Sequence, residues 1–431
     1  MRYVIISLIA ISLLLIPYVA FAQNVEYIGS YDSLCNALRV YVSGNYAFVA
    51  DFDSGLQIID VSNPTDPILT SRYATPDWPV LDVVISGSYG YLACGGLGGN
   101  PDWYGGCLEA IDISNITNPS YAGRNDSTYG KAYDIFISGN YAYVLAHSYI
   151  GSPFYMDVSS EVLFNISDPS NLFLVWSDVR FPRYSPYLDV FISGDYLYDI
   201  YNGLLRIRNI SDPANPIPIG SYSATMQEIM VVGNYVYGAD FSGLLIINIY
   251  DPTNPVLTDS CDVPGYPNSV FVNGIYAYVA AGDSGFAVID VIDPSNSMMV
   301  GYYDTPGSAN DVFVSGDYIY VADGSSLQIL RFTPTGIEEG DKLPSDFSPS
   351  QNYPNPFNAQ TTIQYSIPKE SMVSIDIFDI LGCRIRTIDE GLKPAGNYQA
   401  VWDASNQASG IYFYRFKAGE YIEMKKIVLM K

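Results

Sequence analysis

A short stretch that occurs in seven versions constrains the fold of this chain more than any other feature. The first version reads SGNYAFVAD at residues 43–51. Its glycine returns at positions 44, 87, 139, 194, 233, 274 and 316, with successive spacings of 43, 52, 55, 39, 41 and 42 residues. A period near 40 residues with β-type patterning is typical of propellers and repeat arrays rather than of one large sandwich.

Each repeat contains four strand-like runs separated by turns. In the first repeat they are LRVYVSG, YAFVAD, GLQIIDV and PILTSRY, and the turns between repeated runs carry Gly, Asp, Asn or Pro. Four antiparallel strands per repeat predict one propeller blade. Two aromatic positions, Tyr46 and Phe48 in the first repeat, lie two residues apart and therefore on one face of the second strand. We expect them to fill the space between blades.

The two ends of the repeat region predict how the ring closes. The seventh repeat, DVFVSGDYIYVADGSSLQILRF, supplies three strands and then stops. Its missing outer strand occurs at the start of the chain, where VEYIGSYDS (25–33) resembles IPIGSYSA (217–224). We therefore predict an all-β chain in which residues 23–333 form a seven-bladed β-propeller closed by the N-terminal strand, with no exposed circular edge.

The first 22 residues have the pattern of a secretory signal peptide. Arg2 precedes an apolar run from Val4 to Leu15, and Ala20-Phe21-Ala22 provides a small-residue cleavage site. The apolar run is too short to span a bilayer comfortably, and no later segment resembles a membrane helix. We expect export through the inner membrane and no membrane span in the mature protein, with an uncleaved anchor as the alternative.

The charge of the chain is strongly acidic and unevenly placed. The formal net charge is −25, and nine of the 20 Lys and Arg but only eight of the 45 Asp and Glu lie from Phe347 onward. An acidic field of this size repels nucleic acid and anionic lipid, so neither is an expected partner. The acidity favours solubility outside the cell, and divalent cation binding is the other interpretation.

The five cysteines do not form a disulfide framework, but two of them fall on either side of one hairpin turn when the repeats are aligned. Cys94 and Cys107 occupy the positions of Asp51 and Gly55 in the first repeat, which flank a tight hairpin turn. Their sulfur atoms could therefore meet across neighbouring strands. Because an exported protein passes through an oxidising compartment, we predict a Cys94–Cys107 disulfide.

The repeats resemble a known family in their third strand and the turn after it. The stretches GLQIIDVSNPTDP, GCLEAIDISNITNP, GLLIINIYDPTNP and GFAVIDVIDPSN look like the LVIVD repeat family, over residues 25 to about 333. The resemblance implies a propeller and is nearly silent on activity. Repeats three and four depart from the pattern, with EVLFNISDPSN and LLRIRNISDPANP.

A second domain follows a polar linker at residues 334–346. Short alternating runs over residues 347–431 predict a small Ig-like β-sandwich. The ordered motifs SQNYPNPFNAQTTIQYSIP, DILG, PAGNYQAVWDA, SGIYFYRF and KKIVLMK resemble the type A sorting domain of the type IX secretion system (Por secretion C-terminal domain). An ordinary sandwich module without an export role is the alternative.

This resemblance implies a partner and a location. It implies that an outer-membrane export machine recognises the domain, followed by cleavage and surface attachment or release. The recognition elements that it implies are Tyr353, Pro354, Asn355, Pro356, Lys425, Lys426 and Lys431.

No catalytic set is visible in the sequence. The single histidine, His147, falls in the expanded loop of repeat three, and no triad, thiol–histidine pair, phosphate loop or Cys/His metal spacing accompanies it. We assign no catalytic residues and no certain cofactor. Hydrolysis by paired carboxylates stays open, because a sequence does not give the separation of two acids.

One constellation of acids does stand out. The residues five positions before each repeat glycine are Arg39, Asp82, Asp134, Asp189, Glu228, Ser269 and Asp311. Each begins an inner strand, so five carboxylates should crowd one mouth of the central channel. Crowded like charges raise one another's pKa or recruit a counter-ion, and Ca²⁺ favours carboxylate oxygens. The alternative is that each acid bonds the turn entering its own strand.

The longest insertions lie on the face of the channel mouth. The loops at 74–81, 95–106, 147–160 and 180–188 should carry aromatic side chains to this loop face. These are Trp78, Trp103, Tyr104, Phe154, Tyr155, Tyr184 and Tyr187. Aromatic rings beside carboxylates suit a surface polysaccharide or an extracellular protein partner, unless the loops merely pack on one another. We hypothesise an exported binding protein. The alternatives are a polysaccharide-degrading enzyme that uses carboxylates and tyrosines of this face, and a structural spacer.

Overall fold

A computed structural model describes residues 24–430 except 53, 76–77, 96–104, 151–155, 181–186, 335–346, 350–351, 353, 370, 381, 394–395 and 420. The predicted signal peptide and the predicted linker from residue 335 on lie outside this part. The described residues form 35 strands and no helix. No segment of the described residues is therefore a helix able to cross a membrane.

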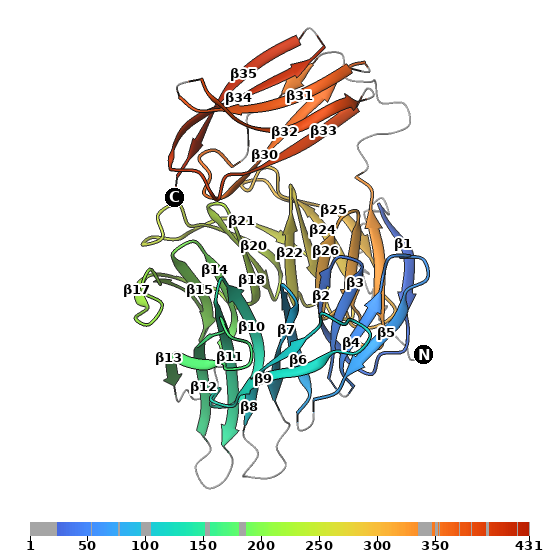
Figure 1. The fold of residues 1–431 in the computed structure, drawn as a ribbon, viewed down its shortest axis with the longest axis vertical. Helices are drawn as coiled ribbons and strands as arrows, with labels where there is room; N and C mark the ends of the chain where they lie inside the picture. The colour runs from blue at the N-terminus through green and yellow to red at the C-terminus, as the bar shows by residue number, and fades with distance from the viewer. Residues whose placement is uncertain are drawn as a thin grey trace, which may run out of the picture.

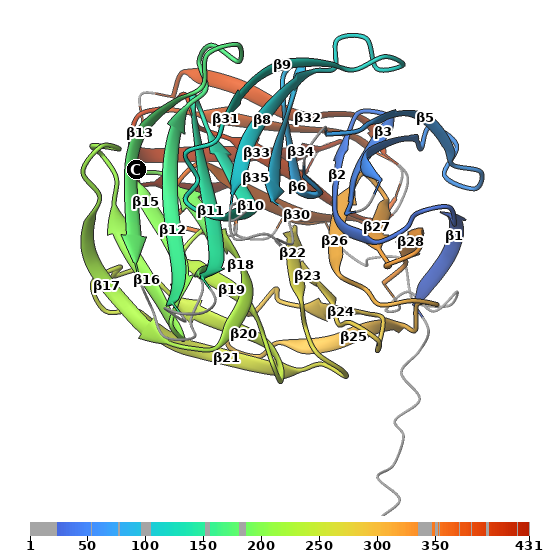
Figure 2. The ribbon, with the colours of Figure 1, turned by 90° about the horizontal axis from the view of Figure 1, so that it is seen from below.

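Seven four-stranded antiparallel sheets are arranged around a central axis (Figure 2). Blade 1 consists of β2 (Ala37–Ser43), β3 (Tyr46–Asp51), β4 (Gly55–Asp60) and β5 (Ile68–Tyr73). Blade 2 consists of β6 (Val80–Ser86), β7 (Tyr89–Gly95), β8 (Gly106–Asp112) and β9 (Ser120–Asn125). Blade 3 consists of β10 (Lys131–Ser138), β11 (Tyr141–Ile150), β12 (Met156–Asn165) and β13 (Phe173–Arg180).

Blades 4 to 6 repeat this order. Blade 4 consists of β14 (Tyr187–Ser193), β15 (Tyr196–Tyr201), β16 (Leu204–Asn209) and β17 (Ile217–Ser223). Blade 5 consists of β18 (Met226–Val232), β19 (Tyr235–Asp240), β20 (Gly243–Asn248) and β21 (Val256–Asp262). Blade 6 consists of β22 (Ser269–Asn273), β23 (Tyr276–Ala280), β24 (Phe286–Asp290) and β25 (Met298–Tyr303).

Blade 7 is shared between the two ends of the propeller. It contains β26 (Asp311–Ser315), β27 (Tyr318–Ala322), β28 (Leu327–Phe332) and, as its outer strand, β1 (Val25–Tyr31). β1 pairs antiparallel with β28 from Val25↔Phe332 to Tyr31↔Leu327. The N-terminal strand thus closes the ring, which confirms the predicted blade count and closure.

Both faces of each blade are buried against its neighbours, which explains the apolar strands. In β3, Val49 packs in the cluster shared with blade 7, whereas Phe48 packs in the cluster shared with blade 2. Phe48 is 2% exposed, and burying such a side chain stabilises the fold by roughly 1.5–3 kcal/mol. Tyr46 packs beside Phe48 on the same cluster. The recurring aromatic pair therefore fills the space between blades 1 and 2.

The C-terminal domain is a sandwich of two sheets. One sheet has the order β29-β30-β33 and the other β32-β31-β34-β35. The strands are β29 (Ser348–Pro349), β30 (Gln360–Ile367), β31 (Ser371–Phe378), β32 (Arg384–Lys393), β33 (Gly396–Asp403), β34 (Gly410–Ala418) and β35 (Tyr421–Leu429). Trp402, Tyr414 and Phe416 are buried between the sheets.

The sandwich lies against one face of the propeller (Figure 1). This hairpin face carries the turns between first and second strands, which contain the repeat glycines. The hairpin glycines have positive φ, 60° at Gly233, a conformation that strongly favours glycine. A Cβ placed on Gly233 would lie 3.0 Å from Pro354 Cγ of the sandwich. The channel mouth formed by the starts of the first strands opens on the opposite loop face.

Candidate functional site

The structure brings the predicted acidic ring together at the channel mouth. All members except Ser269 line a cavity of about 170 Å³ at the starts of the first strands. The carboxylates of Asp82, Asp134, Asp189 and Asp311 are largely buried, with residue exposures of 5–7%. This volume is smaller than the roughly 300–1,000 Å³ of ordinary ligand pockets. The cavity is therefore a polar cup too small for a sugar chain.

Each of the five carboxylates bonds the backbone of the next blade. Each carboxylate accepts a hydrogen bond of 2.6–3.3 Å from one backbone N–H. The donor and acceptor pairs are Val40 to Asp311, Ile135 to Asp82, Val190 to Asp134, Ile229 to Asp189 and Val270 to Glu228. These donors belong to inner strands, whose channel-side edge has no neighbouring strand to pair with. Buried N–H groups need an acceptor, and the carboxylates supply it. The ring therefore ties adjacent blades together.

This arrangement differs from the simplest sequence interpretation of the ring. Only Asp82 also bonds its own strand, through Val83 N at 2.7 Å. Among the described residues, no three His, Cys, Asp or Glu side chains form a group suited to a metal ion. The Ca²⁺ site stays a prediction, and any ion there would compete with backbone donors for the same oxygens.

Two members of the ring that are not acids supply hydrogen-bond donors. Arg39 Nη1 donates to Glu228 Oε2 and lies 3.6 Å from Asp311 Oδ1. Ser269 Oγ lies 2.8 Å from Glu228 Oε1 and 2.6 Å from Asp311 Oδ1, and its single proton is donated to one of these oxygens at a time. One guanidinium against five carboxylates leaves the ring acidic, which raises the cost of ionising all its members.

Burial and mutual repulsion move the titration of the ring toward neutral pH. Burial and the neighbouring Asp134 raise the pKa of Asp82 to about 7. Burial raises the pKa of Glu228 to about 7 and that of Asp134 to about 6. Burial and Asp134 also raise the pKa of Asp189 well above its ordinary value. Some ring carboxylates therefore gain protons in mildly acidic solution, where ordinary Asp and Glu side chains stay ionised.

Apolar side chains form the floor of the cup. The residues two positions after the ring members, on the same face of each first strand, include Tyr41, Phe136, Phe191, Phe271 and Phe313. The ring centroids of Phe136 and Phe191 are 4.7 Å apart, and those of Phe271 and Phe313 are 4.8 Å apart. A ligand of any size is consequently expected on the loop face outside the cup.

Among the seven loop-face aromatic residues predicted from the sequence, Trp78 is the one whose side chain the structure describes. Its ring packs against the core between blades 1 and 2, and the Arg124 guanidinium stacks on it 4.2 Å from the centroid. Arg124 Nη1 lies 3.8 Å from Glu109 Oε2, and Tyr73 donates to Glu109 Oε1 at 2.6 Å. Trp78 is thus held in a packed cluster rather than presented freely.

The other predicted loop aromatics fall outside what the structure describes. Tyr187 begins β14, but its side chain is not described. The remaining positions outside the described residues are Trp103, Tyr104, Phe154, Tyr155 and Tyr184.

Three exposed aromatic residues on the same face were missed by the sequence reasoning. Tyr129 and Tyr266, in blade-to-blade loops, are 48% and 73% exposed, and Phe241, in a second-to-third-strand loop, is 54% exposed. Their loops are short, so a search limited to the longest insertions passed over them. Reading every loop of the same topological type would have found them.

The lone histidine lies in a strand, not in a loop as predicted. His147 belongs to β11 and pairs with Lys131 in β10 and Ser159 in β12. β11 extends to Ile150 and β12 begins at Met156, so the third repeat lengthens its hairpin strands where the sequence suggested an irregular loop.

The predicted disulfide partners lie directly opposite one another. Cys94 in β7 pairs with Cys107 in β8. Both side chains are fully buried, and both residues are free thiols in this structure. The register is compatible with the proposed bridge, which stays a prediction.

The sorting segment lies along the free edge of the last strand. Asn355 Nδ2 donates to Lys426 O at 3.3 Å, and Asn355 Oδ1 accepts from Val428 N at 2.8 Å. Phe357 continues this pairing, with its N–H on Val428 O at 3.0 Å. Pro354 O accepts from Asn352 and Thr361, and Lys425 Nζ donates to Pro349 O. Asn355 thus replaces a neighbouring strand at β35. The Asn355–Pro356 peptide bond, which follows this residue, is cis. Tyr353 and Lys431 lie outside the described residues.

The fold and the site define a closed β-propeller scaffold joined to a β-sandwich whose last strand is covered at its edge. The propeller of the Doa1 WD40 domain matches this chain with a TM-score of 0.54 at 7% identity, covering 72% of this chain and 97% of that one. The Neurospora crassa Pan2 WD40 domain matches with a TM-score of 0.53 at 9% identity, covering 73% and 97%. At such identities the likeness shows the fold alone.

The repeat and the C-terminal domain are each matched by a family. The LVIVD repeat matches residues 36–75, 129–147, 188–224, 225–263, 264–305 and 306–330. The secretion system C-terminal sorting domain matches residues 351–430. No curated protein sequence matches the chain. The chain is an LVIVD-repeat β-propeller followed by a sorting domain, and this domain directs it through the type IX secretion machinery to the cell surface or the extracellular space.

Proposed function

We propose that the exported propeller binds an extracellular partner through its loop face and catalyses no reaction. The observation that carries this proposal is the set of exposed aromatic side chains on loops around a rigid ring. Tyr129, Phe241 and Tyr266 are each about half exposed or more, although large apolar groups are normally buried. Exposed aromatic residues on loops of a rigid scaffold favour a binding surface.

The ring carboxylates support binding rather than catalysis. A general acid or nucleophile must be able to reach a substrate, but each acid of this ring already bonds the next blade. The cup that they line is also small, at about 170 Å³. The partner classes that fit are a polysaccharide, whose sugar rings stack on aromatic faces, and an extracellular protein, whose apolar side chains pack there.

The test uses the mature full-length protein and a triple variant, Tyr129→Ala, Phe241→Ala and Tyr266→Ala. Binding to extracellular polysaccharides and to the proteins secreted by the same cells is measured by surface capture. A matched control removes two aromatic residues exposed on the outer strands, Tyr121 and Phe173, which are 60% and 48% exposed.

Loss of binding in the triple variant but not in the control supports the loop face. Equal binding by all three proteins refutes it. The same polysaccharides are assayed for cleavage, because turnover that disappears in Asp134→Asn would replace the binding proposal with that of a hydrolase.

A further inference from the structure

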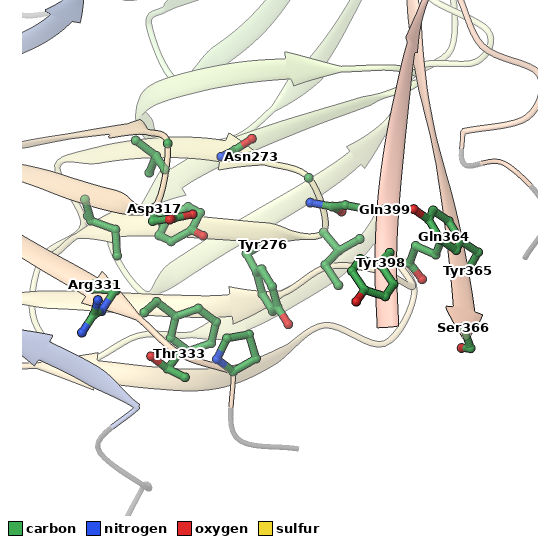
Figure 3. A pocket seen from close by; sticks show the side chains of 18 residues that line it. Asn273, Tyr276, Asp317, Arg331, Thr333, Gln364, Tyr365, Ser366, Tyr398 and Gln399 are labelled. Atoms are coloured by element: carbon green, nitrogen blue, oxygen red, sulfur yellow. The ribbon is translucent and has the colours of Figure 1, made fainter. Parts of the chain in front are cut away.

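A second concavity lies not on the loop face but between the two domains. A cavity of about 650 Å³ lies where the hairpin face of blades 6 and 7 meets β30 and β33 of the sandwich (Figure 3). This volume falls within the roughly 300–1,000 Å³ typical of small-ligand sites. Its position separates it from the loop face, the acidic ring and the covered edge of β35.

The walls of this junction pocket combine aromatic rings with amide side chains. Tyr276 enters from the propeller, and Tyr398 and Gln399 come from β33 of the sandwich (Figure 3). Asn273 from a propeller hairpin and Gln364 from β30 complete the amide groups. Each amide offers both donors and acceptors, and each ring offers an apolar face.

The two rings are held by aromatic neighbours of their own domains. Tyr276 packs edge-to-face on Phe332 with centroids 5.0 Å apart. Tyr398 stacks on the buried Tyr365 with centroids 5.5 Å apart. The two walls also approach closely, because a Cβ on Gly274 would lie 3.8 Å from Gln399 Oε1. The pocket is therefore a preformed site whose two walls come from different domains.

The charges of the pocket disfavour strongly ionic ligands. Asp317 and Arg331 are the charged residues that line it. Arg331 Nη2 pairs with Glu26 Oε2 at 2.6 Å, so its charge is already balanced by a carboxylate of the same blade. The propeller as a whole is acidic, which repels anions further.

We propose that this junction pocket binds a neutral oligosaccharide segment. A sugar ring offers a C–H face that packs on an aromatic ring and a rim of hydroxyl groups that bond to amides and a carboxylate. Tyr276 provides the stacking face, because the Tyr398 ring packs on the sandwich core, with Tyr365 stacked on it and Lys393 Nζ 5.6 Å from its centroid. Asn273, Asp317, Gln364 and Gln399 provide the polar partners. The inference is independent of the loop face, since it concerns another surface and another set of residues.

The experiment titrates the mature full-length protein with maltohexaose, cellohexaose and mannohexaose by isothermal titration calorimetry. Two variants, Gln399→Ala and Asp317→Ala, remove polar partners whose side chains are exposed, so the fold is expected to stay intact. Each has a matched control. Gln360→Ala changes an exposed glutamine of the same sheet outside the pocket, and Asp195→Ala changes the corresponding hairpin residue of blade 4.

Binding of at least one hexasaccharide, weakened about tenfold by Gln399→Ala and Asp317→Ala but not by the controls, is the expected result. Absence of binding to all three sugars overturns the proposal. So does binding that the two pocket variants leave unchanged, or that the triple loop-face variant alone removes. The last result would support the loop face as a sugar site, which keeps the two proposals distinguishable.

Discussion

Blades 3 and 4 differ from the other blades at two buried positions of their third strands. Glu161 in β12 occupies the place held elsewhere by Leu56, Leu108, Leu205, Leu244, Phe286 and Leu327. Arg208 in β16 occupies the place held by Ile59, Ile111, Phe164, Ile247, Ile289 and Leu330. Arg208 Nη2 donates to Glu161 Oε2 and, at 2.9 Å, to Asp199 Oδ2. An ion pair thus replaces apolar packing between these two blades.

The burial of this pair makes its partners mutually dependent. The side chains of Glu161 and Asp199 are 0% exposed and that of Arg208 is 5% exposed. Burial raises the pKa of Glu161 to about 7 even though Arg208 lowers it. Asp199 has a second partner in Arg206, at 2.5 Å. Removing Arg208 therefore affects Glu161 most, because it takes away the ion-pair partner of this carboxylate in a dry site.

We expect Arg208→Met to lower the free energy of unfolding by about 3–5 kcal/mol, the usual cost of breaking a buried pair from one side. The double variant Glu161→Leu/Arg208→Ile restores the residue types of the other blades. We expect it to equal the native protein or to exceed it by up to about 4 kcal/mol, because Glu161 and Arg208 then no longer need desolvation and Asp199 keeps Arg206 as a partner. The single variant should be the least stable of the three proteins.

The assay is urea denaturation of the mature protein at pH 8, followed by far-ultraviolet circular dichroism and intrinsic fluorescence together. Coincidence of the two transitions justifies a two-state free energy. A loss below about 1 kcal/mol in Arg208→Met would refute the reasoning about desolvation. A double variant as unstable as the single variant would refute the claim that the positions are exchangeable for the apolar repeat residues.

Four further outcomes follow from the same structure. Because burial raises the pKa of Asp82 to about 7, its protonated form stabilises the fold fully below about pH 4, and this contribution is lost as the pH rises through 7. The urea midpoint should therefore fall between about pH 4 and pH 7, and it should fall less in Asp82→Asn. Deleting residues 25–31 should cost about 3–6 kcal/mol and cause aggregation, seen by light scattering, because β28 becomes an open edge. Non-reducing mass spectrometry of the exported protein should show a Cys94–Cys107 bridge, and two free thiols would contradict it. Asn355→Ala should destabilise the sorting domain by about 1–3 kcal/mol in thermal melts, because two hydrogen bonds to β35 are lost. An unchanged melting temperature would show that these two hydrogen bonds do not stabilise the domain.

The periodic parts of the fold were predictable, because a blade repeats its pattern in sequence. The seven glycines gave the number of blades, and VEYIGSYDS gave the closing strand, since strand patterning survives even when the strand is far from its sheet. The lengthened β11 was not predicted, because alternation in the run from His147 is weak and its loop was judged by composition. The junction pocket was not predicted either, since its two walls, within residues 273–334 and 364–399, belong to separate domains.

For the acidic ring, the sequence identified the residues but not their main hydrogen-bond partners. The sequence placed five acids at one mouth, but their main partners are backbone donors 40 to 271 residues away, which no local pattern reveals. The exception supports this account of the ring. The member before Asp82 is Arg39, which has no acceptor for Val83 N, and there Asp82 bonds Val83 N itself at 2.7 Å.

The backbone of the propeller therefore gives a structural reason for the acidic residues at the channel mouth. Inner strands present edge N–H groups to the channel, and short acidic side chains at the start of each preceding blade accept from them. Register shifts at Val80/Asp82 and Ala132/Asp134 place the bulged positions beside these acids. The need for acceptors of these N–H groups fixes the residue types in the ring, but it does not act on the loops beyond the ring. The exposed aromatic residues of those loops accept no hydrogen bond from an inner strand. This difference from the ring is the physical reason for expecting the binding partner at the loops.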